Sequence, residues 1–466
     1  MFAAIVDTFR NCFKIPELKS RILFTLMVLA VCRLEAVVRI PGLDGEALAN
    51  YFSSRAGAAG GASVLGMMSM FTGGALEHCA VGALGIMPYI SATIIIQLLT
   101  AVIPTLSKLA REEGGRTKII QYGRYLTVLL CLGQGLVMAI GWENPSRLFQ
   151  GWTAGPLVIG YSPSHIWFYR LQTTLLLTTG TMLLMWLGEQ ITERGIGNGV
   201  SLVITIGILA RLPQAAVALK DMFVGGGGHE ASFNLGHAAA LILLLAGVIA
   251  GVIAITQAQR KVPVQYAQRA VGRKVFSGGT SFLPLKVNYS GVMPIIFAQA
   301  ILMFPQKILQ MLGQSFKIKL FIDLASLVQE GALLYITLYG LMILFFSYFW
   351  VATQFNELQI ADDLKKNGGY IPGVRPGQAT SDYLHNAMSR ITLAGAVFLT
   401  VIAVIPIVLS RVINPPIPYQ VATFFGGTSM LILVGVMLDT MRQMETHLLM
   451  RNYDGFLKKG RLKGRF

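Results

Sequence analysis

Residues 63–104 read SVLGMMSMFTGGALEHCAVGALGIMPYISATIIIQLLTAVIP, and this hydrophobic stretch does not fit a single helix. Its first part, Ser63–Phe71, is too short to cross a bilayer, because a spanning helix needs about 20 apolar residues. Its second part, Cys79–Ile103, is long enough and carries Pro88 near its start. We therefore predict a short broken helix, a glycine hinge at residues 73–74, and then a true span. Non-helical backbone at membrane depth must be buried by protein or reached by water, so the break predicts an aqueous cavity beside it.

The composition of the chain indicates a polytopic membrane protein. Of its 466 residues, 54% are hydrophobic and only 13% are charged, and the mean hydropathy is +0.61. A soluble domain with one core does not have this balance. The four cysteines lie far apart, which predicts neither a zinc site nor a disulfide framework. No small-residue cleavage site follows the first apolar run, so we expect that run to be a retained anchor.

Ten apolar runs have the length and flanking charge of membrane spans, which predicts an all-α fold. A cytoplasmic N-terminal segment, residues 1–21, precedes the first run. The predicted spans are Ile22–Val38, Cys79–Ile103, Ile119–Ile140, Trp167–Leu187, Val200–Leu212, Ala238–Thr256, Met293–Leu312, Leu333–Thr353, Ile391–Ser410 and Pro418–Asp439.

The distribution of lysine and arginine predicts that both termini face the cytoplasm. With that orientation, the N-terminal segment, four loops and the tail at 440–466 hold 27 of the 38 basic residues. Basic residues concentrate on the cytoplasmic side of membrane proteins. The net charge of +16 then reflects this topology and anionic lipid, an explanation that we favour over nucleic-acid binding. On the outer side, Gly225–Gly228 predicts a flexible tether within the loop at 213–237.

Two cytoplasmic loops have the character of partner-binding surfaces. The loop at 256–290 contains an alternating apolar and polar run, which predicts a projecting hairpin. The loop at 356–390 places an arginine between two proline–glycine turns, although a solvated charge of little energetic value is the alternative. Exposed loops on a rigid scaffold usually carry contacts with partners. The basic residues expected to contact partners are Arg260, Lys261, Arg269, Arg273, Lys274 and Arg375.

The motifs that the chain lacks argue against an enzyme and against an ion-coupled carrier. It has no G-x-x-x-x-G-K-[ST] phosphate loop and no nucleophile elbow, and its six histidines fall at span ends or in loops. We therefore expect no catalytic residue, cofactor or metal site. No carboxylate falls near the centre of a predicted span, whereas coupled carriers usually have one there. An inverted-repeat solute carrier and an intramembrane enzyme are the alternatives to a passive channel.

Five motifs, in order and at matching topological positions, resemble the SecY family of protein-conducting channels. Two features depart from the family pattern: Glu35 at the end of the first span, and the glycine run in the outer loop. The motifs are residues 82–92 (GALGIMPYISA), 188–199 (GEQITERGIGNG), 283–294 (LPLKVNYSGVMP), 372–377 (PGVRPG) and 425–429 (FGGTS).

The resemblance implies two inverted five-helix halves, residues 22–212 and 238–439, that close like a clamshell around an hourglass pore. It also implies a constriction of branched aliphatic side chains, although an isoleucine in a span faces lipid or a neighbouring helix far more often than a pore. Such a ring offers no hydrogen bond to select cargo, and it excludes water by dewetting. The implied ring residues are Ile86, Ile90, Val200, Ile204, Ile296 and Ile432.

The resemblance makes residues 57–74 a plug, where a re-entrant or surface helix would otherwise be equally compatible. Glycines on both sides act as hinges, and small residues and methionine pack loosely enough to leave. An incoming chain can displace the plug only if a few kcal/mol hold it. The implied plug residues are Ser63, Val64, Leu65, Gly66, Met67, Met68, Ser69, Met70 and Phe71.

The resemblance also implies a seam toward lipid, between the second and third spans of one half and the seventh and eighth spans of the other. Glutamines there either join helices or take part in gating, and hydrogen bonds of this kind average roughly 0.6 kcal/mol. A seam that opens lets each segment of cargo partition by its own hydropathy. The implied gate residues are Ser91, Gln97, Gln134, Gln299 and Phe304.

The partners implied by the resemblance belong to a translocon in the inner or plasma membrane of the cell. Membrane subunits similar to SecE and SecG would lie beside the chain. A SecA motor ATPase or a ribosome would dock on the cytoplasmic loops, and the basic tail would lie on anionic lipid or on a ribonucleoprotein. Signal sequences and unfolded polypeptides would be the substrates.

Overall fold

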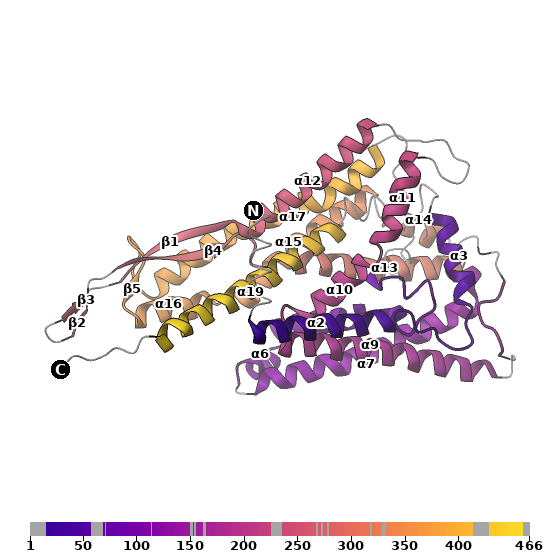
Figure 1. Ribbon diagram of the computed structural model, residues 1–466, viewed down its shortest axis with the longest axis horizontal. Coiled ribbons are helices and arrows are strands. Elements are labelled where there is room, and N and C mark those ends of the chain that lie inside the picture. The colour runs from indigo at the N-terminus through magenta and orange to yellow at the C-terminus, as the bar shows by residue number, and fades with distance from the viewer. Residues whose placement is uncertain are drawn as a thin grey trace.

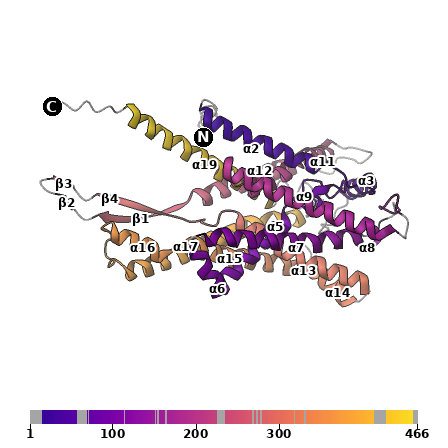
Figure 2. The same cartoon turned by 90° about the horizontal axis from the view of Figure 1, so that it is seen from below.

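Most helices run along the long axis of the molecule, and a strand hairpin projects beyond them at one end (Figure 1). Figure 2 shows the same arrangement from below, with α6 turned away from the other helices. The computed structural model describes residues 15–56, 69, 71–112, 114–149, 152, 155–161, 165–224, 235–266, 269–271, 274–276, 279–316, 319–328, 332–412 and 428–459.

Each of the ten predicted spans contains a helix, and the tenth is described only from Thr428 onward. In the first half the elements are α2 (Pro16–Glu35), α3 (Gly45–Ala56), η1 (Val81–Leu84), α5 (Met87–Val102), α6 (Pro104–Arg111), α7 (Gly115–Glu143), α8 (Pro145–Leu148), α9 (Ile166–Arg194), α10 (Gly199–Leu209) and α11 (Leu212–Val224). The rest of the chain forms α12 (Leu235–Gln257), β1 (Gln259–Tyr266), β2 (Arg269–Val271), β3 (Lys274–Phe276), β4 (Thr280–Lys286), α13 (Met293–Phe316), α14 (Lys319–Leu327), α15 (Leu333–Gln354), α16 (Glu357–Lys366), β5 (Gly369–Tyr370), α17 (Gln378–Val412) and α19 (Thr428–Lys459).

Six helices in the described ranges are long and apolar enough to cross a membrane, or seven if the bent pair α5–α6 counts as one span. The two members of that pair meet at 104°. The other predicted spans coincide with α2, α13 and α19, and α13 is apolar only over Met293–Leu302. Ten spans therefore remains a prediction.

The second span begins later than its hydropathy predicted, at Met87 rather than at Cys79. Cys79 has a φ of 49° and Gly85 a φ of 61°, and these left-handed conformations do not continue an α-helix. A single 3-10 turn, η1, lies between them. Pro88 occupies the first turn of α5, where its missing N–H costs nothing.

The predicted hairpin of the loop at 256–290 is confirmed. β1 pairs antiparallel with β4, from Gln259 opposite Lys286 to Gln265 opposite Thr280. The other edge of β1 pairs with β5 from the second cytoplasmic loop, so both loops share one three-stranded sheet. Val262 and Val264 of β1 are buried in a small core that α15 and α17 complete.

Two of the expected loops are partly helical. α11 occupies the first part of the outer loop at 213–237, and α16 lies within the cytoplasmic loop at 356–390. The side chain of Asn356 accepts a hydrogen bond of 3.2 Å from the Gln359 N–H, which caps α16. The two halves contact each other where α5 packs on α13 and where α10 packs on α19.

Candidate pore and plug

The six predicted ring residues lie in one apolar cluster. They come from the start of α5, the first turns of α10, and the facing parts of α13 and α19. Five of them are only 0–3% exposed, and Val200 is partly buried against the same cluster. Branched side chains from four helices and both halves thus belong to one apolar core, and five of the six are buried in protein rather than facing lipid.

A polar cavity adjoins this cluster on the side of the hairpin. It has a volume of about 210 Å³, and among its lining residues Ser201 follows the ring residue Val200 and Met293 lies three residues before the ring residue Ile296. Asn288 and Asp439 also line it. This cavity, here called the polar entrance, is therefore lined by residues close in sequence to the predicted constriction.

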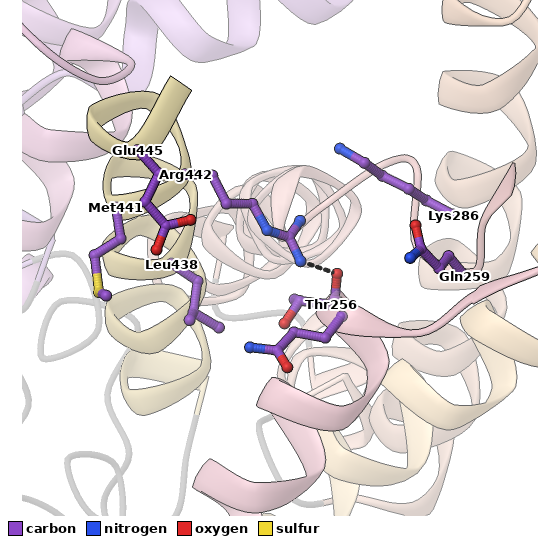
Figure 3. A pocket seen from close by; sticks show the side chains of 8 residues that line it. Thr256, Gln259, Lys286, Leu438, Met441, Arg442 and Glu445 are labelled. Atoms are coloured by element: carbon purple, nitrogen blue, oxygen red, sulfur yellow. Dashed lines mark hydrogen bonds between the residues drawn. The ribbon is translucent and has the colours of Figure 1, made fainter. Parts of the chain in front are cut away.

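A second cavity, of about 350 Å³, lies between α12 and α19 and is drawn in Figure 3. Lys286 and Arg442 line both cavities. Figure 3 shows Arg442 reaching from α19 to the backbone oxygen of Thr256 on α12, to which it donates a hydrogen bond. Glu445 lies on the same wall of α19. The entrance thus carries charges of both signs, in contrast to the ring.

The described part of the predicted plug lies on the other side of the ring. Residues 63–68 and 70 fall outside the described residues, whereas Ser69 and Phe71 are buried. Along α10, Ser201 faces the polar entrance and Gly207 contacts the backbone of Phe71, so the ring separates the two. Residues 73 and 74 have φ values of 63° and 93°, as a glycine hinge requires.

Glu35 lies beside this segment. Its side chain is buried, and neither carboxylate oxygen has a hydrogen-bond partner among the described residues. With Phe71 and Ile86 it lines a cavity of about 30 Å³, which is large enough to hold a water molecule. The glutamate that departs from the family pattern therefore belongs to the space between ring and plug.

Charged side chains that were not among the predicted site residues contact this segment. They are Arg33 at the end of α2, Glu77 in the turn before η1, and Arg211 between α10 and α11. The signal in the sequence was that each charge borders an apolar run, and only Glu77 lies close to the glycine hinge along the chain. Pairing Glu77 with Arg211, which is 134 residues away, required the fold.

The predicted seam residues lie on helices that pack together, because α5 contacts both α7 and α13. Ser91 is buried and donates to the Met87 carbonyl at 3.0 Å. The buried side-chain oxygens of Gln97 and Gln299 have no partner among the described residues. Gln134 is half-buried on α7, and Phe304 lies on α13 with its side chain outside the description. The glutamine oxygens therefore do not join these helices by hydrogen bonds.

The motif at 188–199 forms a tight joint between α2, α9, α10 and α19. A Cβ on Gly199 would lie 1.8 Å from the Gly188 oxygen, so only glycine fits there. The turn donates backbone N–H bonds to two side chains that the motif did not mark, Thr25 of α2 at 3.1 Å and Gln443 of α19 at 2.9 Å. The joint therefore links the first half to the last helix of the second.

The predicted partner-binding residues lie at the hairpin end of the molecule. Arg260 and Lys261 are exposed on β1, and Arg375 is exposed in the loop after β5. Arg269 and Lys274 lie on β2 and β3 near the tip, and Arg273 falls outside the described residues. Because β1 and β5 pair, these residues belong to one projecting unit (Figure 1).

Helices of membrane-spanning length around a buried aliphatic cluster and an adjoining polar cavity indicate a multi-span membrane channel. The SecY family model matches residues 80–441. The chain is 42% identical to the protein translocase subunit SecY of Chlamydia trachomatis over 98% of its own length and 99% of the relative, and 41% identical to that of Thermotoga maritima with the same coverage. The chain belongs to the SecY family of protein translocase subunits.

Solved structures agree on the fold. A protein-conducting channel aligns with a TM-score of 0.58 at 17% identity, covering 92% of each chain. A SecY protein whose plug domain is described as stabilising the closed state aligns with a TM-score of 0.57 at 17% identity and the same coverage. Canine Sec61 in a ribosome–channel complex aligns with a TM-score of 0.53 at 16% identity, again over 92% of each chain.

Proposed function

We propose that the chain is the pore subunit of a protein-export channel. It conducts unfolded secretory polypeptides across the membrane and releases apolar segments sideways into lipid. The observation that supports this proposal is the placement of six branched aliphatic residues from both halves in one apolar core, next to a cavity lined by Ser201 at one end of α10 and to Phe71 at the other. The ring in its closed form is Ile86, Ile90, Val200, Ile204, Ile296 and Ile432.

The ring suits a cargo of any sequence. Aliphatic side chains offer no hydrogen bond to the passing chain and form a flexible seal around it, while a constriction too apolar to wet blocks ions. The chain supplies no energy of its own in this proposal, so transport is passive through the pore and is driven by a partner.

The family and the exposed basic residues of the projecting unit support the choice of partners. A SecA motor or a ribosome docks on the basic residues of the hairpin and on Arg375, and subunits similar to SecE and SecG bind in the membrane. The relative described in a ribosome complex supports the ribosome in this role. We place the chain in the inner or plasma membrane, with anionic lipid around it and both termini in the cytoplasm.

Photo-crosslinking of a stalled secretory chain tests the proposal. A photoreactive residue at position 86, 204, 296 or 432 should capture the stalled chain in each of the four variants. The matched control is Ile242, which is 67% exposed on α12 and should capture only lipid. Capture at one of the four positions alone would place the translocation path elsewhere.

A further inference from the structure

Ser69 and residues 71–77, here called the stem, are held by side chains that the pore itself does not use. Arg211 donates from Nη2 to Glu77 Oε1 at 2.6 Å, and the same nitrogen donates to Ser69 Oγ. The Ser69 hydroxyl in turn donates to Glu77 Oε1 at 2.9 Å. Both ends of the stem are therefore joined through one guanidinium group.

This ion pair is shielded from water. The side chains of Arg211 and Glu77 are 14% and 11% exposed, whereas those of the surface pair Arg39 and Glu46 are 50% and 76% exposed. Removing one partner of a buried pair leaves an uncompensated charge, which is far more costly than losing a surface pair. The stem is therefore stable only while Arg211 and Glu77 remain together.

A second arginine holds the middle of the stem. Arg33 at the end of α2 donates from Nη1 to the Gly73 carbonyl oxygen at 3.1 Å. The stem backbone there lies directly on α10, since a Cβ on Gly207 would be 2.8 Å from the Phe71 oxygen and one on Gly73 would be 2.9 Å from the Gly207 Cα. The two arginines thus hold a series of tight backbone turns against α10 at Gly207.

We propose that Arg33 and Arg211 form a clamp that holds the stem against α10 and thereby sets how easily the plug is released. The inference rests on the proposed function, in which residues 57–74 close the pore. All of the clamp residues belong to the first half, whereas the ring takes Ile296 and Ile432 from the second. The clamp therefore adds to plug release a barrier that the contacts between the halves do not supply.

Accessibility of a cysteine in the stem tests the clamp in the complete channel. Thr72 is 7% exposed, so Thr72→Cys, in a chain whose native cysteines are replaced by serine, should react slowly with a membrane-impermeant maleimide added on the outer side. Adding Arg211→Gln or Glu77→Gln should accelerate the reaction about 100-fold, the order expected from unpairing a buried charge. Arg33→Gln should act in the same direction.

Two controls separate loss of the clamp from misfolding. Arg170→Gln breaks another ion pair, to Glu143 at 2.8 Å, which joins α9 to α7 away from the stem, and it should leave the labelling rate unchanged. The exchange of charges in Glu77→Arg with Arg211→Glu should restore slow labelling. A rate that stays slow in both Arg211→Gln and Glu77→Gln would overturn the clamp.

Ion conductance of the same variants in planar bilayers separates the clamp from the plug. Faster labelling together with higher conductance supports both the clamp and the assignment of residues 57–74 as the plug. Faster labelling with unchanged conductance leaves the clamp in place and contradicts the assignment of residues 57–74 as the seal.

Discussion

Isoleucine and valine provide all six predicted ring residues, and their shape matters at this position. Branching at Cβ restricts χ1, so the side chains keep a narrow opening instead of folding away from it. Five of the six are buried, and all six belong to or pack against the same apolar cluster. A seal of this kind depends on apolar surface rather than on any single bond. A single substitution should therefore raise the ion conductance less than a paired substitution does.

We predict that Ile86→Ser combined with Ile432→Ser raises the ion conductance of the resting channel several-fold. Two hydroxyl groups at the constriction let water enter, and ions follow water. The measurement is conductance in planar bilayers. The paired control, Ile242→Ser with Leu243→Ser on the exposed face of α12, should leave conductance unchanged. Equal conductance in ring variants and parent would remove these residues from the constriction.

Arg375 is presented by a turn rather than by a flexible loop. Gly373 and Gly377 have φ values of 83° and 105°, and the Thr380 hydroxyl donates to the Arg375 carbonyl at 2.9 Å. An exposed guanidinium fixed in this way presents a forked donor to carboxylates or phosphates of a partner.

We predict that Arg375→Glu leaves the protein inserted and stable but abolishes ATP-driven export into reconstituted vesicles. Lys366→Glu, an equal charge reversal on the exposed end of α16, should be mild. Normal export by the Arg375→Glu protein would return this arginine to the role of a solvated charge.

The helices and strands that follow from the spacing of apolar residues could be predicted from the sequence. Apolar runs located ten helices, and alternation in β1 gave the hairpin. Positive φ values at Cys79 and Gly85 shortened the second span, because hydropathy counts apolar residues but does not register a backbone conformation. The clamp could not be predicted, since Glu77 and Arg211 become partners only through the packing of the stem on α10.

We predict that Ser91 and Phe304 face each other across the closed seam between α5 and α13. In a chain without native cysteines, Ser91→Cys with Phe304→Cys should oxidise to a disulfide, which requires Cα atoms about 4.4–6.8 Å apart. The disulfide should block export, and a reductant should restore it. Each single-cysteine variant should export normally under oxidation. Normal translocation by the oxidised pair would place the seam elsewhere.

At the scale of the molecule, the two contacts between the halves differ in kind. The joint at 188–199 is bonded through backbone N–H groups to side chains of α2 and α19. The contact between α5 and α13 instead leaves glutamine oxygens without partners among the described residues. Two halves that open on one side need a strong contact to turn about and a weak contact that separates. The joint at 188–199 and the contact between α5 and α13 match these two requirements.

We predict that linking α10 to α19 leaves export intact. Leu202 and Thr440 approach the same point, since a Cβ on Gly197 would lie 3.0 Å from Leu202 Cδ1 and 3.1 Å from Thr440 Oγ1. Leu202→Cys with Thr440→Cys, joined by a short bismaleimide, should therefore tolerate translocation, whereas the Ser91–Phe304 disulfide should not. If both links stop export equally, the two halves do not turn about the joint at residues 188–199 when the channel opens.

The pairing of β1 with β5 joins the two cytoplasmic loops into one arm that connects to α12 and α13. The hairpin continues from α12 and leads into α13, and β5 ties the arginine loop to the same rigid arm. We therefore expect a force on the hairpin tip to act on the start of α13. This helix carries Ile296 and contacts α5. A docking partner that merely tilts this arm would strain the channel before any cargo enters it.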